Sequence, residues 1–211
     1  MLENTKNRTG LMTLQPNVCV FCGSGPGRNP AYVAGAHELG HIIAKSGIGL
    51  VYGGGSNGLM GEVARSVQAS GGRVLGIIPE FLSAKERIFT EANELVVTAT
   101  MHERKMTMFE RSDGFIVLPG GMGTLEELAE MSTWAQLDRH KKPIILCNIE
   151  NYWQPLLVLL KHMRDEYFIR PGLELKVEVT STPKEAVARF IQHIEKKEPQ
   201  PVPFKPVRQQ M

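Results

Sequence analysis

The sequence GFIVLPGGMGTLEE, residues 114–127, joins an apolar run to a segment with helical spacing. Phe115–Leu118 is continuously apolar, which is typical of a strand buried on both faces of a parallel sheet. A helix is expected to follow over residues 125–137. The glycines, the threonine and the two glutamates at this junction have two explanations. They form either a tight turn with a helix cap, or a phosphate site with a catalytic acid beside it.

Apolar runs and helical segments alternate along most of the chain. Strands are expected at 18–21, 49–52, 74–78, 94–97, 115–118, 143–147 and 177–180. Helices are expected at 32–45, 59–69, 102–111, 125–137, 153–166 and 184–196. Continuously apolar strands separated by helices indicate an α/β fold with a parallel sheet covered on both faces.

The ends of the chain differ from this pattern. Residues 1–15 are polar and are expected to form a flexible N-terminal arm. Residues 16–197 are expected to form a single domain. Residues 198–211 carry Pro199, Pro201, Pro203 and Pro206, and are expected to form a Pro-rich flexible tail because proline interrupts helices and central strands.

Composition excludes several classes of function. The 211 residues include 24 basic and 22 acidic side chains, so no basic surface indicates a nucleic-acid partner. No apolar run approaches the roughly 18 residues of a membrane helix, and no signal peptide is visible, so we expect a cytoplasmic protein with no membrane partner. Cys19 and Cys22 have CxxC spacing, but they lack a second ligand pair, and we expect buried structural cysteines and no metal.

Polar and glycine-rich clusters follow five of the expected strands, where ligands bind in sheets of this kind. They are Cys22–Gly25, Gly53–Gly58, Pro79–Glu80, Met101–Lys105 and Pro119–Glu127. Because these strand ends lie at one edge of a parallel sheet, we expect one shared site.

The glycines of Gly120–Thr124 allow a ligand close to the backbone, and the helix behind them offers free N–H groups to phosphate. The alternative is structural, because Thr124-Leu-Glu-Glu127 matches a capping box. Spacing alone leaves both open. In the second cluster, Arg104 and Lys105 are expected to form a cationic wall facing an anionic substrate. The alternative is a solvated helix face paired with Glu103.

The run Gly53–Gly58 fits G-x-G-x-x-G, and Glu80 follows it by 22 residues, at the end of the next expected strand. It predicts either a dinucleotide site or one wall of a mononucleotide pocket in which Glu80 binds ribose hydroxyls. No HExxH, nucleophile elbow or P-loop sequence is present.

These clusters resemble the LONELY GUY (LOG) family. PGGMGTLEE fits the family signature PGGxGTxxE, and Gly53–Gly55, Leu59–Gly61, Pro79–Glu80, Met101–Lys105 and Thr133–Leu137 are similar to the family in the same order. The resemblance covers roughly residues 18–172.

The resemblance implies a Rossmann-like doubly wound fold, no cofactor, and a homodimer or a larger homo-oligomer. It implies an enzyme that cleaves the N-glycosidic bond of N6-substituted adenosine 5′-monophosphates, or of plain AMP, into free base and ribose 5-phosphate. Arg104 and Glu127 would be catalytic. The residues expected to bind the nucleotide are Gly23, Ser24, Gly53, Gly54, Glu80, Lys105, Gly120, Gly121, Met122, Gly123, Thr124, Glu126 and Thr133.

Glycoside hydrolysis passes through an oxocarbenium-like sugar, which a carboxylate such as Glu127 stabilises while it orients water. Arg104 is expected to act electrostatically, since arginine is a poor proton donor. The rival hypotheses are a general nucleotide 5′-monophosphate nucleosidase, a non-catalytic nucleotide-binding module and a dinucleotide-dependent oxidoreductase. Some relatives are also labelled lysine decarboxylase, but no lysine in the sequence stands out as activated.

Overall fold

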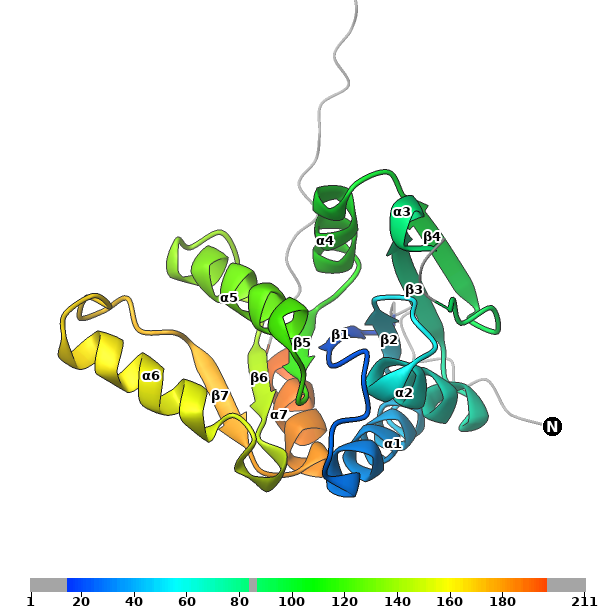
Figure 1. The fold of residues 1–211 in the computed structure, drawn as a ribbon, viewed down its shortest axis with the longest axis horizontal. Coiled ribbons are helices and arrows are strands. Elements are labelled where there is room, and N and C mark those ends of the chain that lie inside the picture. The colour runs from blue at the N-terminus through cyan, green and yellow to red at the C-terminus, as the bar shows by residue number, and fades with distance from the viewer. Residues whose placement is uncertain (1–14, 84–86, 197–211) are drawn as a thin grey trace, which may run out of the picture.

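The structure is a computed structural model that describes residues 15–83 and 87–196. Its centre is one parallel sheet in the order β4-β3-β2-β1-β5-β6-β7 (Figure 1). The strands are β1 (Asn17–Phe21), β2 (Gly49–Tyr52), β3 (Val74–Pro79), β4 (Glu94–Thr98), β5 (Gly114–Val117), β6 (Ile144–Cys147) and β7 (Val177–Thr180). The predicted parallel α/β fold is confirmed. Apart from Gln15, the expected arm and the expected tail lie outside the described residues.

Helices cover both faces of the sheet. They are α1 (Pro30–Lys45), α2 (Gly58–Ala69), α3 (Glu80–Ser83), α4 (Met101–Glu110), α5 (Met122–Gln136), α6 (Gln154–Asp165) and α7 (Pro183–Glu195), with a 3-10 turn at Ile149–Asn151. Residues of α1, α2 and α7 pack in one core cluster, and residues of α4 and α5 pack in the other, with Trp153 at the start of α6. The expectation of a doubly wound sheet is therefore confirmed. The short helix α3 was not predicted.

The central strands are buried because the two core clusters lie on opposite sides of them. Along β1, Val18 and Val20 face one cluster and Cys19 and Phe21 face the other. All three cysteines, Cys19, Cys22 and Cys147, are free and buried. Since Cys19 and Cys22 belong to clusters on opposite faces of the sheet, they do not point toward a common metal position, as expected.

The order of the strands reverses at β1. This strand pairs with β2 on one side and with β5 on the other, and Val18 lies level with both Leu50 and Gly114. The connections therefore leave in opposite directions, which opens a crevice beyond the carboxyl ends of β1 and β5. The two loops meet there, since the Gly23 amide donates to the Pro119 carbonyl at 3.0 Å.

The start of α5 differs from the prediction. Its N-cap is Gly121 and its first residue is Met122, three residues before the expected start at Leu125. Thr124 is therefore the third helical residue and is buried. A Cβ at Gly120 would lie 2.1 Å from the Thr124 hydroxyl, so this side chain is packed inward against the loop. The capping-box hypothesis for Thr124 and Glu127 is wrong.

Within residues 15–83 and 87–196, no helix is both long and apolar enough to cross a bilayer.

Candidate active site

Arg104 is a buried cation that reaches the carboxyl end of β2. Its side chain belongs to α4 and is 8% exposed. One terminal nitrogen, Nη2, donates to the Gly53 carbonyl at 3.3 Å. Its Nε is buried without an acceptor, and no carboxylate of the described residues lies within 4.0 Å of the guanidinium. A buried guanidinium with an unused donor indicates a place for an anion or an electron-rich ligand.

Gly53 is required by this arrangement. A Cβ at that position would lie 2.1 Å from Arg104 Nη2, so any larger residue would displace the guanidinium. The prediction that Gly53 and Arg104 share a site is supported by this contact, although the two residues are 51 positions apart.

Lys105, the next residue of α4, is held by two glutamates of α5. Its Nζ lies 2.6 Å from a Glu126 oxygen and 3.0 Å from a Glu130 oxygen. Burial lowers the pKa of Lys105, but the hydrogen bonds and charges of Glu126 and Glu130 outweigh burial and raise it. The lysine is therefore firmly charged and links α4 to α5. Sequence analysis did not single out Glu130, although it follows Glu126 by one helical turn.

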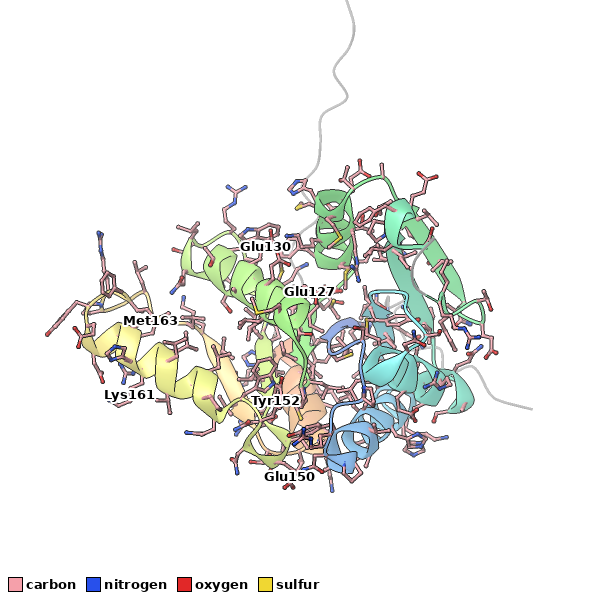
Figure 2. The ribbon with its side chains drawn as sticks, in the orientation of Figure 1. Glu127, Glu130, Glu150, Tyr152, Lys161 and Met163 are labelled. Carbon is pink, nitrogen blue, oxygen red and sulfur yellow. The ribbon has the colours of Figure 1, made fainter. Side chains whose placement is uncertain are left out.

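Glu127 is the carboxyl group with the most unusual proton affinity in this site. Burial raises its pKa to about 7, and the neighbouring Glu126 and Glu130 add to the rise, while Arg104 and Lys105 oppose it. Near neutral pH both of its protonation states are populated, which suits a group that accepts and releases a proton. Figure 2 shows Glu127 and Glu130 on the same helix, α5.

The N-terminus of α5 is open. Gly121 offers no side-chain cap, and no described residue accepts a hydrogen bond from the amides of Met122, Gly123 or Thr124. Met122 is 78% exposed, and Gly121 and Gly123 are also exposed. Free amides together with the positive end of the helix dipole favour the binding of an anion.

The N-terminus of α2 is closed. The amides of Leu59 and Met60 donate to the Gly23 carbonyl at 3.0 and 3.3 Å. Gly58 has φ +56, and a Cβ there would lie 2.4 Å from the carbonyl group of Ser24. The amides that a dinucleotide fingerprint would offer to pyrophosphate are therefore already bonded, and the G-x-G-x-x-G run forms a wall of the crevice instead. Gly54, with φ +78, forms its turn.

Two predicted residues lie further from this cluster. Glu80 is the exposed first residue of α3, at the carboxyl end of β3. Thr133 is exposed and donates to the Ala129 carbonyl of its own helix at 2.7 Å. It follows Glu127 by six residues, about 9 Å along the helix axis. Its nucleotide contact stays a prediction.

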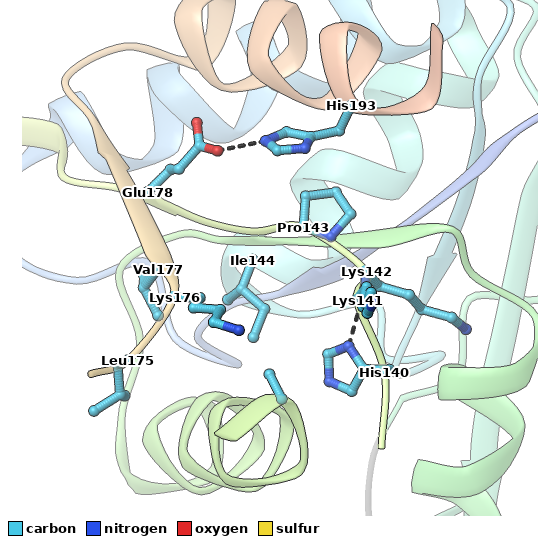
Figure 3. Close-up of a pocket in the computed structure, with 11 residues that line it drawn as sticks. His140, Lys141, Lys142, Pro143, Ile144, Leu175, Lys176, Val177, Glu178 and His193 are labelled. Atoms are coloured by element: carbon cyan, nitrogen blue, oxygen red, sulfur yellow. Dashed lines mark hydrogen bonds and ion pairs between the residues drawn. The ribbon is translucent and has the colours of Figure 1, made fainter. Parts of the chain in front are cut away.

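A separate cavity of about 420 Å³ lies at the opposite, amino edge of the sheet (Figure 3). It lies between α5, β6 and β7, and Glu178 pairs with His193 at its rim. None of the predicted site residues lines it. Within the described ranges no group of three or more His, Cys, Asp and Glu side chains could hold a metal ion.

The chain is similar to several known proteins. A family model described as "Possible lysine decarboxylase" matches residues 60–190. The chain is 45% identical over 170 residues to the cytokinin riboside 5′-monophosphate phosphoribohydrolase LOG7 of Arabidopsis thaliana, with 81% of this chain and 76% of that protein covered. The chain belongs to the LOG family. The probable phosphoribohydrolase LOGL5 of rice is 42% identical, with 84% of this chain and 72% of that protein covered.

A solved structure related to this LOG chain is a molybdenum cofactor binding protein from Rippkaea orientalis. It is 26% identical, with a TM-score of 0.63, and the match covers 87% of this chain and 99% of that one. This chain therefore has a fold similar to that of a protein described as binding the molybdenum cofactor.

The residues of the LOG site do not fit the pyridoxal phosphate chemistry that the words "lysine decarboxylase" imply. A Schiff base needs an uncharged lysine amine. Lys105 is instead paired with Glu126 and Glu130, which hold it protonated. The lysine of this site is suited to binding and to holding two helices together.

Proposed function

We propose that the protein hydrolyses the N-glycosidic bond of cytokinin riboside 5′-monophosphates and related adenosine 5′-monophosphates, releasing the free base and ribose 5-phosphate. The observation that carries the proposal is a guanidinium with an unpaired donor beside a carboxyl group with a raised pKa. Arg104 is a buried guanidinium with an unused donor, and Glu127 is a partly buried carboxyl group with a pKa of about 7. The two groups lie close enough to interact electrostatically, and Glu127 belongs to the helix with the open N-terminus. A nucleoside monophosphate supplies what each of them lacks.

In the proposed complex the 5′-phosphate accepts hydrogen bonds from the amides at the start of α5, up to Thr124. It lies against the backbone of Gly120 and Gly121. Binding the phosphate fixes the distance from the sugar to Glu127, one turn further along the helix. Lys105 adds positive charge nearby, and Glu80 is the proposed partner of the ribose hydroxyls. Gly23 and Ser24 close the opposite side of the crevice.

The reaction then follows from the charges. The bond from C1′ to the purine nitrogen breaks, its electron pair moves to the base, and positive charge develops on the sugar. The Glu127 carboxylate stabilises that charge and accepts a proton from the water whose oxygen bonds to C1′. Arg104 stabilises the negative charge on the departing base, which takes a proton as it leaves.

Base release is the experiment that tests this proposal. The protein is incubated with isopentenyladenosine 5′-monophosphate, with AMP and with the two unphosphorylated nucleosides, and the products are separated by chromatography. We expect free base from the monophosphates and little from the nucleosides. The ratio between the two monophosphates measures the preference for the N6 substituent.

The same experiment distinguishes the hydrolase from a second candidate function, a non-catalytic binding module. The likeness to the molybdenum cofactor binding protein favours this second candidate. A module would bind AMP in calorimetry and release no base. The chain is 45% identical to LOG7 and 26% identical to the molybdenum cofactor binding protein, and the higher identity favours the enzyme.

We further propose a homodimer. None of the residues of α6 is buried, and Val158, Leu159 and Met163 are exposed on it. After this helix, Tyr167 and Phe168 are 77% and 87% exposed. Such an apolar surface favours a protein partner, and a second copy is the simplest one. Light scattering of the wild type and of Phe168→Glu tests the proposal, since a dimer through this face dissociates in the variant and a mass unchanged by it contradicts the assignment.

The proposed compartment is the cytoplasm. Three free cysteines suit a reducing environment, and the proposed substrates are intracellular nucleotides. Fractionation of cells that express the tagged chain tests this assignment.

A further inference from the structure

The turn between β6 and α6 has an unusual backbone. Glu150 and Asn151 are consecutive non-glycine residues with φ of 51° and 57°. Left-handed conformations strain residues that carry a side chain, and strain of this kind concentrates at functional sites. Asn148 holds the turn, because its side chain accepts from the Trp153 amide at 2.7 Å and its carbonyl accepts from the Asn151 amide at 3.2 Å.

The product of this strained turn is the placement of Tyr152. Its hydroxyl donates to the Gly120 carbonyl at 2.5 Å. Its ring packs edge-on against Tyr32, at 5.4 Å between centroids, and against Trp153, at 4.9 Å. Tyr32 lies in the first turn of α1, so Tyr152 touches elements on both sides of the crevice. Figure 2 shows Tyr152 outside α5, on the segment that precedes α6.

The hydrogen bond acts on a peptide group that has little else to orient it. The Gly120 carbonyl and the Gly121 N–H belong to one planar peptide and point in opposite directions. Both residues are glycines, so the peptide between them can rotate more freely than a peptide between two residues with side chains. Fixing the carbonyl oxygen therefore fixes the direction of the Gly121 N–H, which has no acceptor among the described residues.

We propose that Tyr152 is a positioning residue for the anion site. It holds the Gly120–Gly121 peptide so that the Gly121 N–H joins the amides of α5 in binding the phosphate. The strained turn at Glu150 and Asn151 exists to deliver the hydroxyl to that carbonyl. This inference rests on the proposed function only in taking the anion to be the 5′-phosphate of a nucleotide.

The test is Tyr152→Phe, which removes the hydroxyl and keeps the ring contacts. Losing one net hydrogen bond at the phosphate predicts about a fivefold to tenfold rise in KM for the monophosphate, with kcat within about twofold. Calorimetry should give the same rise in the dissociation constant of AMP and no change for adenosine. Tyr32→Phe is the matched control, because its hydroxyl has no partner in the described part of the chain, and it should leave both constants unchanged.

A purely structural role predicts a different pattern, in which the variant weakens AMP and adenosine alike or unfolds at a lower temperature with no selective loss. That result, or an unchanged dissociation constant for AMP, overturns the inference. If the wild type releases no base, the proposed function fails, and the AMP and adenosine measurements still decide the role of Tyr152.

Discussion

The helices α4 and α5 follow neighbouring connections on the same face of the sheet, yet they begin in opposite ways. At α4 the Thr100 hydroxyl accepts from the Glu103 amide at 3.1 Å, and the Glu103 carboxylate accepts from the Ala99 amide at 2.9 Å. At α5 the cap is Gly121, and the first amides have no acceptor within the described ranges. The chain satisfies the donors of one helix, and those of the other are the donors proposed to bind a ligand.

Other helices support this contrast. The α7 helix is capped as α4 is, with the Thr182 hydroxyl accepting from Glu185 and the Glu185 carboxylate accepting from Ser181. The α1 helix is capped by the Asn29 side chain. The α2 and α6 helices also lack a side-chain cap, so α5 differs by having its uncapped N-terminus beside the topological switch point, where the proposed anion site lies.

The largest expected effect separates Glu127 of α5 from Glu103, the first-turn glutamate of α4. Glu127→Gln should lower kcat by about 10²–10⁴-fold, because the amide accepts no proton and carries no charge to stabilise the sugar. Glu103→Gln is the matched control, since glutamine also serves in a capping box, and it should keep near-wild-type turnover. Base release measures both. Near-wild-type turnover in Glu127→Gln would end the catalytic assignment.

The second prediction converts the open helix into a capped one. Gly121→Asp adds a side chain where a Cβ meets nothing within 4 Å. The carboxylate should cap α5 and stabilise the fold by about 0.5 kcal/mol, while its charge raises KM for the monophosphate about 30-fold or more. Gly121→Asn caps without the charge and should lose less affinity. Unchanged KM in Gly121→Asp would show that phosphate binds elsewhere.

The third prediction concerns pH and stability. The pKa of Glu127 is about 7 in the folded protein and near 4.3 in the unfolded chain, so the folded state binds the proton more tightly. Stability is therefore lost as pH rises from about 4.3 to 7 and then levels off. Compared with the wild type, Glu127→Gln should gain about 1–3 kcal/mol at pH 8 and little at pH 4. Urea unfolding at both pH values measures the difference, and equal shifts would contradict the raised pKa.

The smallest effect is expected at the capped helices. Thr100→Ala and Thr182→Ala should each lower the free energy of unfolding by about 1 kcal/mol, since each leaves one amide without its cap. Neither should change kcat at a temperature where the protein stays folded. Thermal unfolding and base release check the pair, and a selective fall in kcat for Thr100→Ala would assign a ligand to α4 as well.

The sequence predicted the fold well because buried parallel strands are continuously apolar, and every predicted strand is present. It also predicted that Arg104 and Glu127 come together, since both follow strands of one parallel sheet. The pattern Thr-x-x-Glu was ambiguous. It occurs at Thr100, at Thr107, at Thr124 and at Thr182, and of these only Thr100 and Thr182 are caps. At Thr124 the pattern lies inside the first turn, because Gly121 ends the loop earlier.

The remaining features depend on contacts that spacing does not reveal. Tyr152 reaches Gly120 across 32 positions, through a turn whose left-handed residues have no glycine to announce them. Glu130 matters because Lys105 of another helix lies between it and Glu126. Both depend on how the helices pack.

The most direct test of the open helix is a crystal structure of Glu127→Gln with AMP. The account predicts the phosphate within hydrogen-bond distance of the amides at Met122–Thr124 and C1′ of the ribose beside residue 127. A phosphate bound at α2 or α4, with the N-terminus of α5 left to solvent, would contradict it.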